Sequence, residues 1–146
     1  MKTPNKFEDI KVNIKVKLAA IWTSLMFIII YLDYFHLYMP NSLNDMIAGK
    51  VHVFDVTQGF LLAALAMISI PALFIFLSVV LPAKMNRWAN IIAASINIPL
   101  ILYNLDGVAW VHMVVGAIIQ VILLVLIIYY AWKWPRIDIQ KQLYEL

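Results

Sequence analysis

Two ionisable side chains, Asp33 and His36, lie near the end of a long apolar run, in a segment (31–38) that also holds three tyrosines. A charge buried in hydrocarbon costs about 2.5–3.5 kcal/mol on insertion scales, so a carboxyl group in such a run indicates a functional site. The carboxyl group of Asp33 could take up a proton or bind a cationic group. His36 follows three residues later, so it shares a helical face with Asp33. Asp33 is therefore the first candidate binding residue.

Three more polar side chains are predicted near the same end of other helices. Asp33 is expected ~22 Å along its helix, ~8 Å below the outer membrane boundary. Asn104 falls at a similar height, His112 lies ~6 Å inside the boundary, and Gln58 lies slightly higher. Together with His36, these residues predict a polar pocket in the outer third of the protein, which could bind a small solute.

Each candidate also has a structural explanation. Asp33 could be an interfacial carboxylate that reaches water. His36 could lie among lipid headgroups, and His112, beside Trp110, could belong to an interfacial aromatic belt.

The deeper polar residues favour a role in helix packing. Asn90, Asn97 and Asn104 are spaced by sevens and so share one face. Such a row is more often interhelical hydrogen bonding than a ligand site. Gln120 is expected to bond Asn97 or a carbonyl freed by Pro99. We therefore treat Asn97 and Gln120 as secondary polar positions.

The composition places these residues in a membrane protein. The chain is 64% hydrophobic and 13% charged over 146 residues, whereas soluble domains are about half apolar and a quarter charged. There is no cysteine, so no thiolate site is available. The basic residues flank apolar segments, which argues against a nucleic-acid partner.

The apolar runs predict an all-α fold, a transmembrane four-helix bundle formed by residues 1–146 as one domain. The predicted spans are 18–39, 57–81, 88–104 and 108–132. A small helix is expected in the extracytoplasmic loop at 43–48, and 82–87 is expected to be a tight basic turn. Residues 106–107 should form the last turn.

Residues 10–17 alternate between apolar and polar types, which is typical of a strand, yet they also fit an amphipathic helix. We prefer the helix, because a lone strand at a membrane surface leaves unpaired backbone groups. Ten of the eleven Lys and Arg residues fall on one side of the predicted spans and only Lys50 on the other. Both the basic segment 1–17 and the tail 133–146 are therefore expected in the cytoplasm.

Several segments resemble a family of uncharacterised bacterial four-helix membrane proteins, a domain of unknown function. These segments are 8–24, 33–35, 56–59, 86–88 and 130–136. The resemblance covers nearly the whole chain and implies a protein of the bacterial inner membrane. It implies no activity and no catalytic residue.

Binding or transport of a small solute or proton through Asp33 is the function we expect first. The main alternative is a structural or partner subunit of the membrane without activity of its own. A membrane enzyme, such as an isomerase using Asp33 and His112 as an acid–base pair, is a further alternative. Haem ligation by His36 and His112 is the least favoured, so no cofactor and no metal are expected. The expected partners are the lipid bilayer and either a second copy or another membrane protein.

Overall fold

In the computed structural model, the described residues are 10–51, 54–105 and 109–135. In chain order their elements are α1 (Ile14–His36), α2 (Ser42–Ile47), β1 (Lys50–Val51), β2 (Phe54–Asp55), α3 (Gln58–Val80), α4 (Ala83–Tyr103) and α5 (Val111–Trp132). Two of the long helices are capped at their N-terminus by a side chain. Asn13 Oδ1 accepts a hydrogen bond from the Lys15 N–H at 2.9 Å, and Thr57 Oγ1 accepts one from the Phe60 N–H at 3.1 Å.

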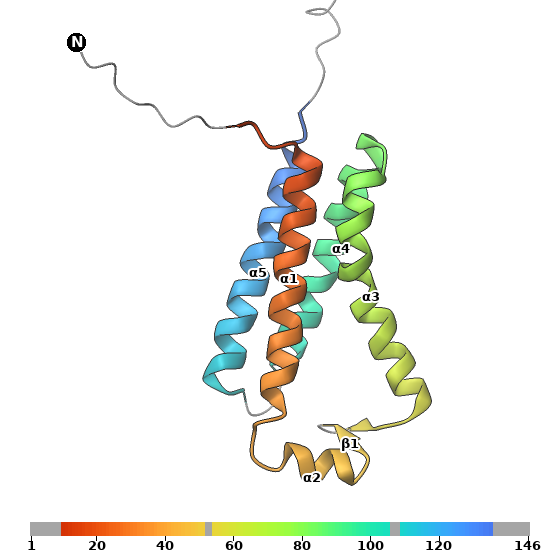
Figure 1. Ribbon diagram of the computed structural model, residues 1–146, viewed down its shortest axis with the longest axis vertical. Coiled ribbons are helices and arrows are strands. Elements are labelled where there is room, and N and C mark those ends of the chain that lie inside the picture. Colours follow the sequence, from red (N-terminus) through yellow and green to blue (C-terminus); the bar gives the residue numbers. More distant parts are fainter. Residues whose placement is uncertain (1–9, 52–53, 106–108, 136–146) are drawn as a thin grey trace, which may run out of the picture.

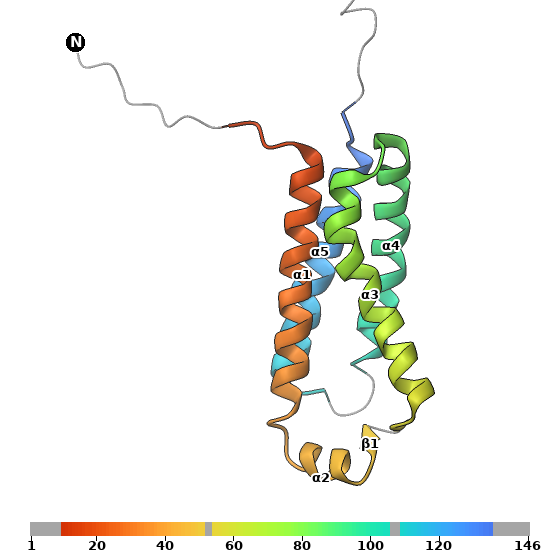
Figure 2. The same cartoon turned by 45° about the vertical axis from the view of Figure 1, so that its right-hand side comes forward.

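The four long helices lie lengthwise beside one another, with α1 in contact with both α3 and α5, and α5 also packed along α4 (Figures 1 and 2). Helix α3 contains Pro71 and bends partway along its length, so its first half diverges from α1 and α4. We call the end where α1 begins and α5 finishes the terminal end. The opposite end carries α2 and the strands, and we call it the hairpin end (Figure 1).

Three helices, α1, α3 and α5, are long and apolar enough to cross a membrane. This confirms the expected helical membrane-protein class in its coarse form. Helix α4 has 21 residues, but it includes Lys84, Arg87 and three asparagines, which make it less apolar than the others. That α4 forms the fourth span stays a prediction.

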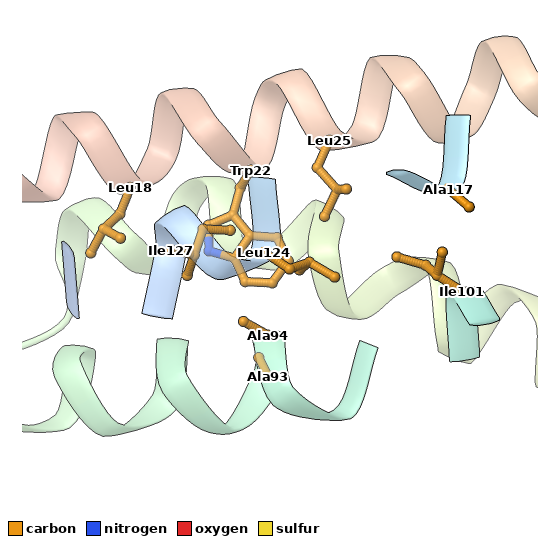
Figure 3. Packing of buried hydrophobic residues seen from close by; sticks show 9 residues of the cluster. All are labelled: Leu18, Trp22, Leu25, Ala93, Ala94, Ile101, Ala117, Leu124 and Ile127. Atoms are coloured by element: carbon orange, nitrogen blue, oxygen red, sulfur yellow. The ribbon is translucent and has the colours of Figure 1, made fainter. Parts of the chain in front are cut away.

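The core lies where α1, α4 and α5 meet. Leu18, Trp22 and Leu25 follow one another at four- and three-residue steps along α1, and all are fully buried. They pack against Leu124 and Ile127 of α5. The whole cluster consists of Leu18, Trp22, Leu25, Ala93, Ala94, Ile101, Ala117, Leu124 and Ile127 (Figure 3). Most of the cluster lies in the terminal half, whereas Ile101 and Ala117 lie nearer the hairpin end (Figure 3).

Two helix starts differ from the sequence expectations. Helix α4 begins at Ala83, not near 88, because Pro82 occupies the N-cap position and 84–87 continue the helix. The expected basic turn over 82–87 is therefore wrong, and the chain reverses at 81–82. Residues 14–17 are helical and form the start of α1, so the preferred helix is confirmed for them and the strand alternative is wrong, whereas 10–13 form neither helix nor strand.

The loop helix expected over 43–48 is confirmed as α2, but the all-α expectation missed the hairpin that follows it. Lys50 pairs with Asp55, and Gly49 turns the chain before the hairpin with φ +74°. Three predicted parts lie outside the described residues: the basic segment before residue 10, the turn at 106–107 and the tail after 135.

Candidate functional site

A hydrogen-bonded cluster joins α1, α3 and α4 in the terminal half of the structure. Asn90 Oδ1 accepts from Trp22 Nε1 at 2.7 Å and from Ser78 Oγ at 3.2 Å. Asn86 Nδ2 donates to the Ser78 carbonyl at 2.6 Å. All four side chains are fully buried, and we call this group the asparagine clamp.

The groups of the asparagine clamp are paired with one another. Asn90 Nδ2 donates to the Asn86 carbonyl at 2.9 Å and to Asn86 Oδ1 at 2.6 Å. Buried polar groups paired in this way fix helix packing, because breaking a bond leaves an unsatisfied group in an apolar interior. The asparagine clamp therefore holds three helices together and leaves little for a ligand to bind.

The two deeper polar residues, Asn97 and Gln120, are also buried, each 7% exposed. Asn97 Nδ2 donates to the Ala93 carbonyl of its own helix at 2.8 Å. Within the described ranges, no hydrogen bond joins Asn97 to Gln120, so the expected pairing between them is not formed. Their position between α4 and α5 supports a packing role.

The five residues predicted to share a polar pocket lie towards the hairpin end, but they do not converge. Asp33, Gln58 and Asn104 are exposed, on α1, at the start of α3 and just after α4 respectively. His36 and His112 are half-buried at the end of α1 and the start of α5. Over the part of the chain that the structure describes, no hydrogen bond joins any two of these side chains.

An aromatic hollow opens at the hairpin end, between the end of α1 and the start of α5. Its volume is about 240 Å³, and it is lined by Phe35, Tyr38, Met39, Trp110 and His112. The Trp110 ring meets the His112 imidazole edge-on, with centroids 6.2 Å apart and planes at 71°. Drug-sized ligands occupy ~300–1,000 Å³, so this aromatic hollow suits a smaller molecule of one or two rings.

His112 and Tyr38 are the lining residues of the aromatic hollow that carry polar groups, and the Tyr38 hydroxyl is already hydrogen-bonded to that of Tyr34, which leaves His112 as the candidate ligand contact. Its Nε2 atom is buried and has no hydrogen-bond partner among the described residues. One turn further along α5, a Cβ added at Gly116 would lie 2.6 Å from Leu32 Cδ2, so this glycine lets α1 and α5 approach closely. An unsatisfied buried polar group costs ~1–3 kcal/mol, and a ligand that paired with Nε2 would recover part of that cost.

Asp33 occupies a different side of α1 from the α5-facing Leu32. It follows Leu32 by one residue and is therefore ~100° further around the helix. Lys15 lies five turns before Asp33, so both residues are on the same side of α1. Lys15 Nζ donates a hydrogen bond to the Val79 carbonyl of α3 at 3.1 Å. Asp33 thus lies on the flank of α1 that faces α3 at the terminal end, and its side chain is exposed. Figures 1 and 2 show that α3 diverges from α1 towards the hairpin end.

Two features of the structure were missed by the sequence analysis. Phe35 and Tyr38 line the aromatic hollow, although neither was among the predicted binding residues. Trp22 donates to Asn90 across 68 positions of sequence. An indole N–H in the middle of an apolar run needs a hydrogen-bond acceptor. This requirement could have predicted a polar partner for Trp22 on another helix.

A family model matches residues 5–141, nearly the whole chain, and its description is a family of unknown function. Searches of curated proteins and of solved structures gave no match. The resemblance to a domain of unknown function is therefore confirmed, while the bacterial and inner-membrane parts of that expectation stay predictions. The chain belongs to the family of unknown function DUF6326.

Proposed function

We propose that α1, α3, α4 and α5 all cross a bilayer as a four-helix bundle. For α4, the support is the distribution of its side chains. Asn86 and Asn90 are buried, whereas Ile92 and Ile96 are more than half exposed. A helix that turns polar groups inward and apolar groups outward suits a lipid environment, and its inward asparagines lower its average hydropathy.

We further propose that both termini lie in the cytoplasm, in a bacterial inner membrane. Within the described ranges, basic residues gather at the terminal end, and Lys50 lies at the hairpin end. The basic residues at the terminal end are Lys11, Lys15, Lys17, Lys84, Arg87 and Lys133. Such an imbalance supports a cytoplasmic location for the basic end.

Membrane-impermeant thiol labelling tests this topology directly, because the native chain has no cysteine. In intact cells, Lys50→Cys should be labelled and Lys84→Cys should be labelled only after lysis. Labelling of both positions from the same side would refute the crossing of α3, because these residues flank that helix.

We propose that the protein binds a small, flat and mostly apolar molecule carrying a hydroxyl or carbonyl group. The observation that carries this proposal is the aromatic hollow together with His112 Nε2, which has no hydrogen-bond partner in the part of the chain that the structure describes. The rings would pack against the ligand, and the imidazole, once its Nε2 turns toward the hollow, would supply the directional contact. Because the terminal half is filled by the buried core, we propose binding at the outer end and no passage through a single chain.

The test compares ligands with and without the polar group. We would measure equilibrium binding of 2-naphthol, menadione and naphthalene to the protein in nanodiscs, subtracting uptake by empty nanodiscs. 2-Naphthol and menadione should bind about 2- to 12-fold more tightly than naphthalene, the range that corresponds to one net hydrogen bond.

The variant His112→Phe keeps the ring and should abolish this preference. Tyr103→Phe is the matched control, because Tyr103 is an exposed aromatic residue near the same end that does not line the aromatic hollow. If no probe binds wild type above empty nanodiscs, the ligand proposal fails and the structural or partner-subunit alternative takes its place.

A second candidate keeps Asp33 as the group that binds a proton or a small cation. It is supported by the position of Asp33, an exposed carboxyl within an apolar helix, three residues before His36. It predicts that Asp33→Asn abolishes proton-coupled uptake in proteoliposomes. It also predicts that the same variant leaves naphthol binding unchanged, because Asp33 does not line the aromatic hollow.

A further inference from the structure

Cationic side chains at the terminal end lie over aromatic rings. The Arg87 guanidinium carbon is 5.4 Å from the ring centroids of both Trp88 and Trp132. Lys133 Nζ is 4.6 Å from the ring centroid of Tyr129, and it donates to the Tyr129 hydroxyl at 2.8 Å. Lys84, three residues before Arg87, shares its face of α4. We call Lys84, Arg87, Trp88 and Trp132 the Arg87 surface.

The Arg87 guanidinium group would meet a ligand through its terminal Nη nitrogens, because Nε has almost no accessible surface. Its Nε atom is buried and has no hydrogen-bond partner in the described ranges. The acidic residues within those ranges are Asp33, Asp45 and Asp55, which all lie towards the hairpin end. The chain as described therefore supplies no carboxylate beside Arg87.

The start of α4 favours an anion at the same place. The first turn of α4 contains no acidic residue, and its N-cap, Pro82, makes no side-chain cap hydrogen bond. The N-terminus is the positive end of the helix dipole, so cations there are destabilised. An anion at the same place is stabilised by the dipole and by the free N–H groups. An anion bound by Lys84 and Arg87 would offset the unfavourable interaction of these two cations with the helix N-terminus.

The height of the Arg87 surface identifies the class of anion. Trp88 and Trp132 are 48% and 62% exposed, as expected of tryptophans in an interfacial belt, where lipid phosphates also lie. The planar guanidinium group matches a phosphate with two parallel N–H donors. We infer that the Arg87 surface binds the phosphate group of an anionic phospholipid. This inference goes beyond the proposed function: it needs the membrane location but not the aromatic hollow.

Native mass spectrometry with graded dioleoylphosphatidylglycerol tests the inference, with dioleoylphosphatidylcholine as the zwitterionic comparison. Arg87→Gln should weaken phosphatidylglycerol binding about fivefold, which corresponds to one basic residue at an anionic surface. Arg87→Lys should lose less, because it keeps the charge. Lys11→Gln removes an equal charge from the same end outside the Arg87 surface and should change affinity less than twofold.

Three results would overturn the inference. These are an unchanged affinity in Arg87→Gln, an equal loss in Lys11→Gln, or full displacement of the lipid by excess inorganic phosphate, which would make free phosphate the ligand. If Arg87→Gln does not fold, as judged by circular dichroism, Trp132→Leu replaces it. That variant keeps every charge but removes the Trp132 ring, one of the two rings beside the guanidinium group. An unchanged affinity for phosphatidylglycerol in this variant would also count against the Arg87 surface.

Discussion

Replacing Asn90 by leucine tests whether the asparagine clamp holds the helices together. The change roughly preserves side-chain volume but removes the acceptor of Trp22 Nε1 and Ser78 Oγ, and the donor to Asn86 Oδ1. Hydrogen bonds between membrane helices contribute ~0.6 kcal/mol each on average. Two of these bonds, from Trp22 and Ser78, join Asn90 to other helices, which gives an expected loss of about 1 kcal/mol in the free energy of unfolding.

Unfolding by sodium dodecyl sulfate in mixed micelles, followed by circular dichroism, measures this loss. Ser95→Ala is the matched control, because Ser95 lies on the exposed side of α4 and should change stability by less than ~0.5 kcal/mol. Trp22→Phe removes the indole donor, so combining it with Asn90→Leu should cost less than the sum of the two single changes. If Asn90→Leu is as stable as Ser95→Ala, the asparagine clamp does not stabilise the bundle.

Two further predictions, one of them with a control variant, concern the hairpin end. Gly116→Leu should destabilise the protein by ~1–3 kcal/mol through overpacking against Leu32, whereas Gly59→Ala, at an open helical position, should be neutral or slightly stabilising in the same unfolding assay. Equal effects of the two would contradict the close approach of α1 and α5. Asp33→Asn should change the free energy of unfolding by less than ~0.5 kcal/mol, because the side chain is exposed; a loss above ~2 kcal/mol would show a buried partner for Asp33.

The long helices could be predicted from the sequence because apolar runs and prolines mark them. The expected span 57–81 corresponds to α3, and 108–132 corresponds closely to α5. The start of α4 was harder, because Lys84 and Arg87 suggest a loop until Pro82 is recognised as the residue before the helix. Local charge was therefore a poorer guide than the capping position.

The site could be predicted only in part. Seven-residue spacing correctly places Asn90 and Asn97 on the buried face of α4, but the helix ends at Tyr103 and leaves Asn104 exposed. Heights along separate helices also suggested that Asp33 and His112 would meet. Height does not fix rotation about each helix axis, and the Leu32–Gly116 contact orients α1 with Asp33 away from the α5-facing side. Such rotation follows from packing between helices, which a single sequence does not display.

The most direct test of the proposed binding site is the imidazole nitrogen spectrum of His112. Protein labelled with ¹⁵N-histidine in nanodiscs would be titrated with 2-naphthol, and His112→Phe would assign the resonance. We predict that the His112 Nε2 resonance shifts and saturates with the measured binding curve, while the resonances of His36 and His52 stay within the shifts seen with naphthalene. No shift at His112, or equal shifts at all three histidines, would contradict a ligand site in the aromatic hollow.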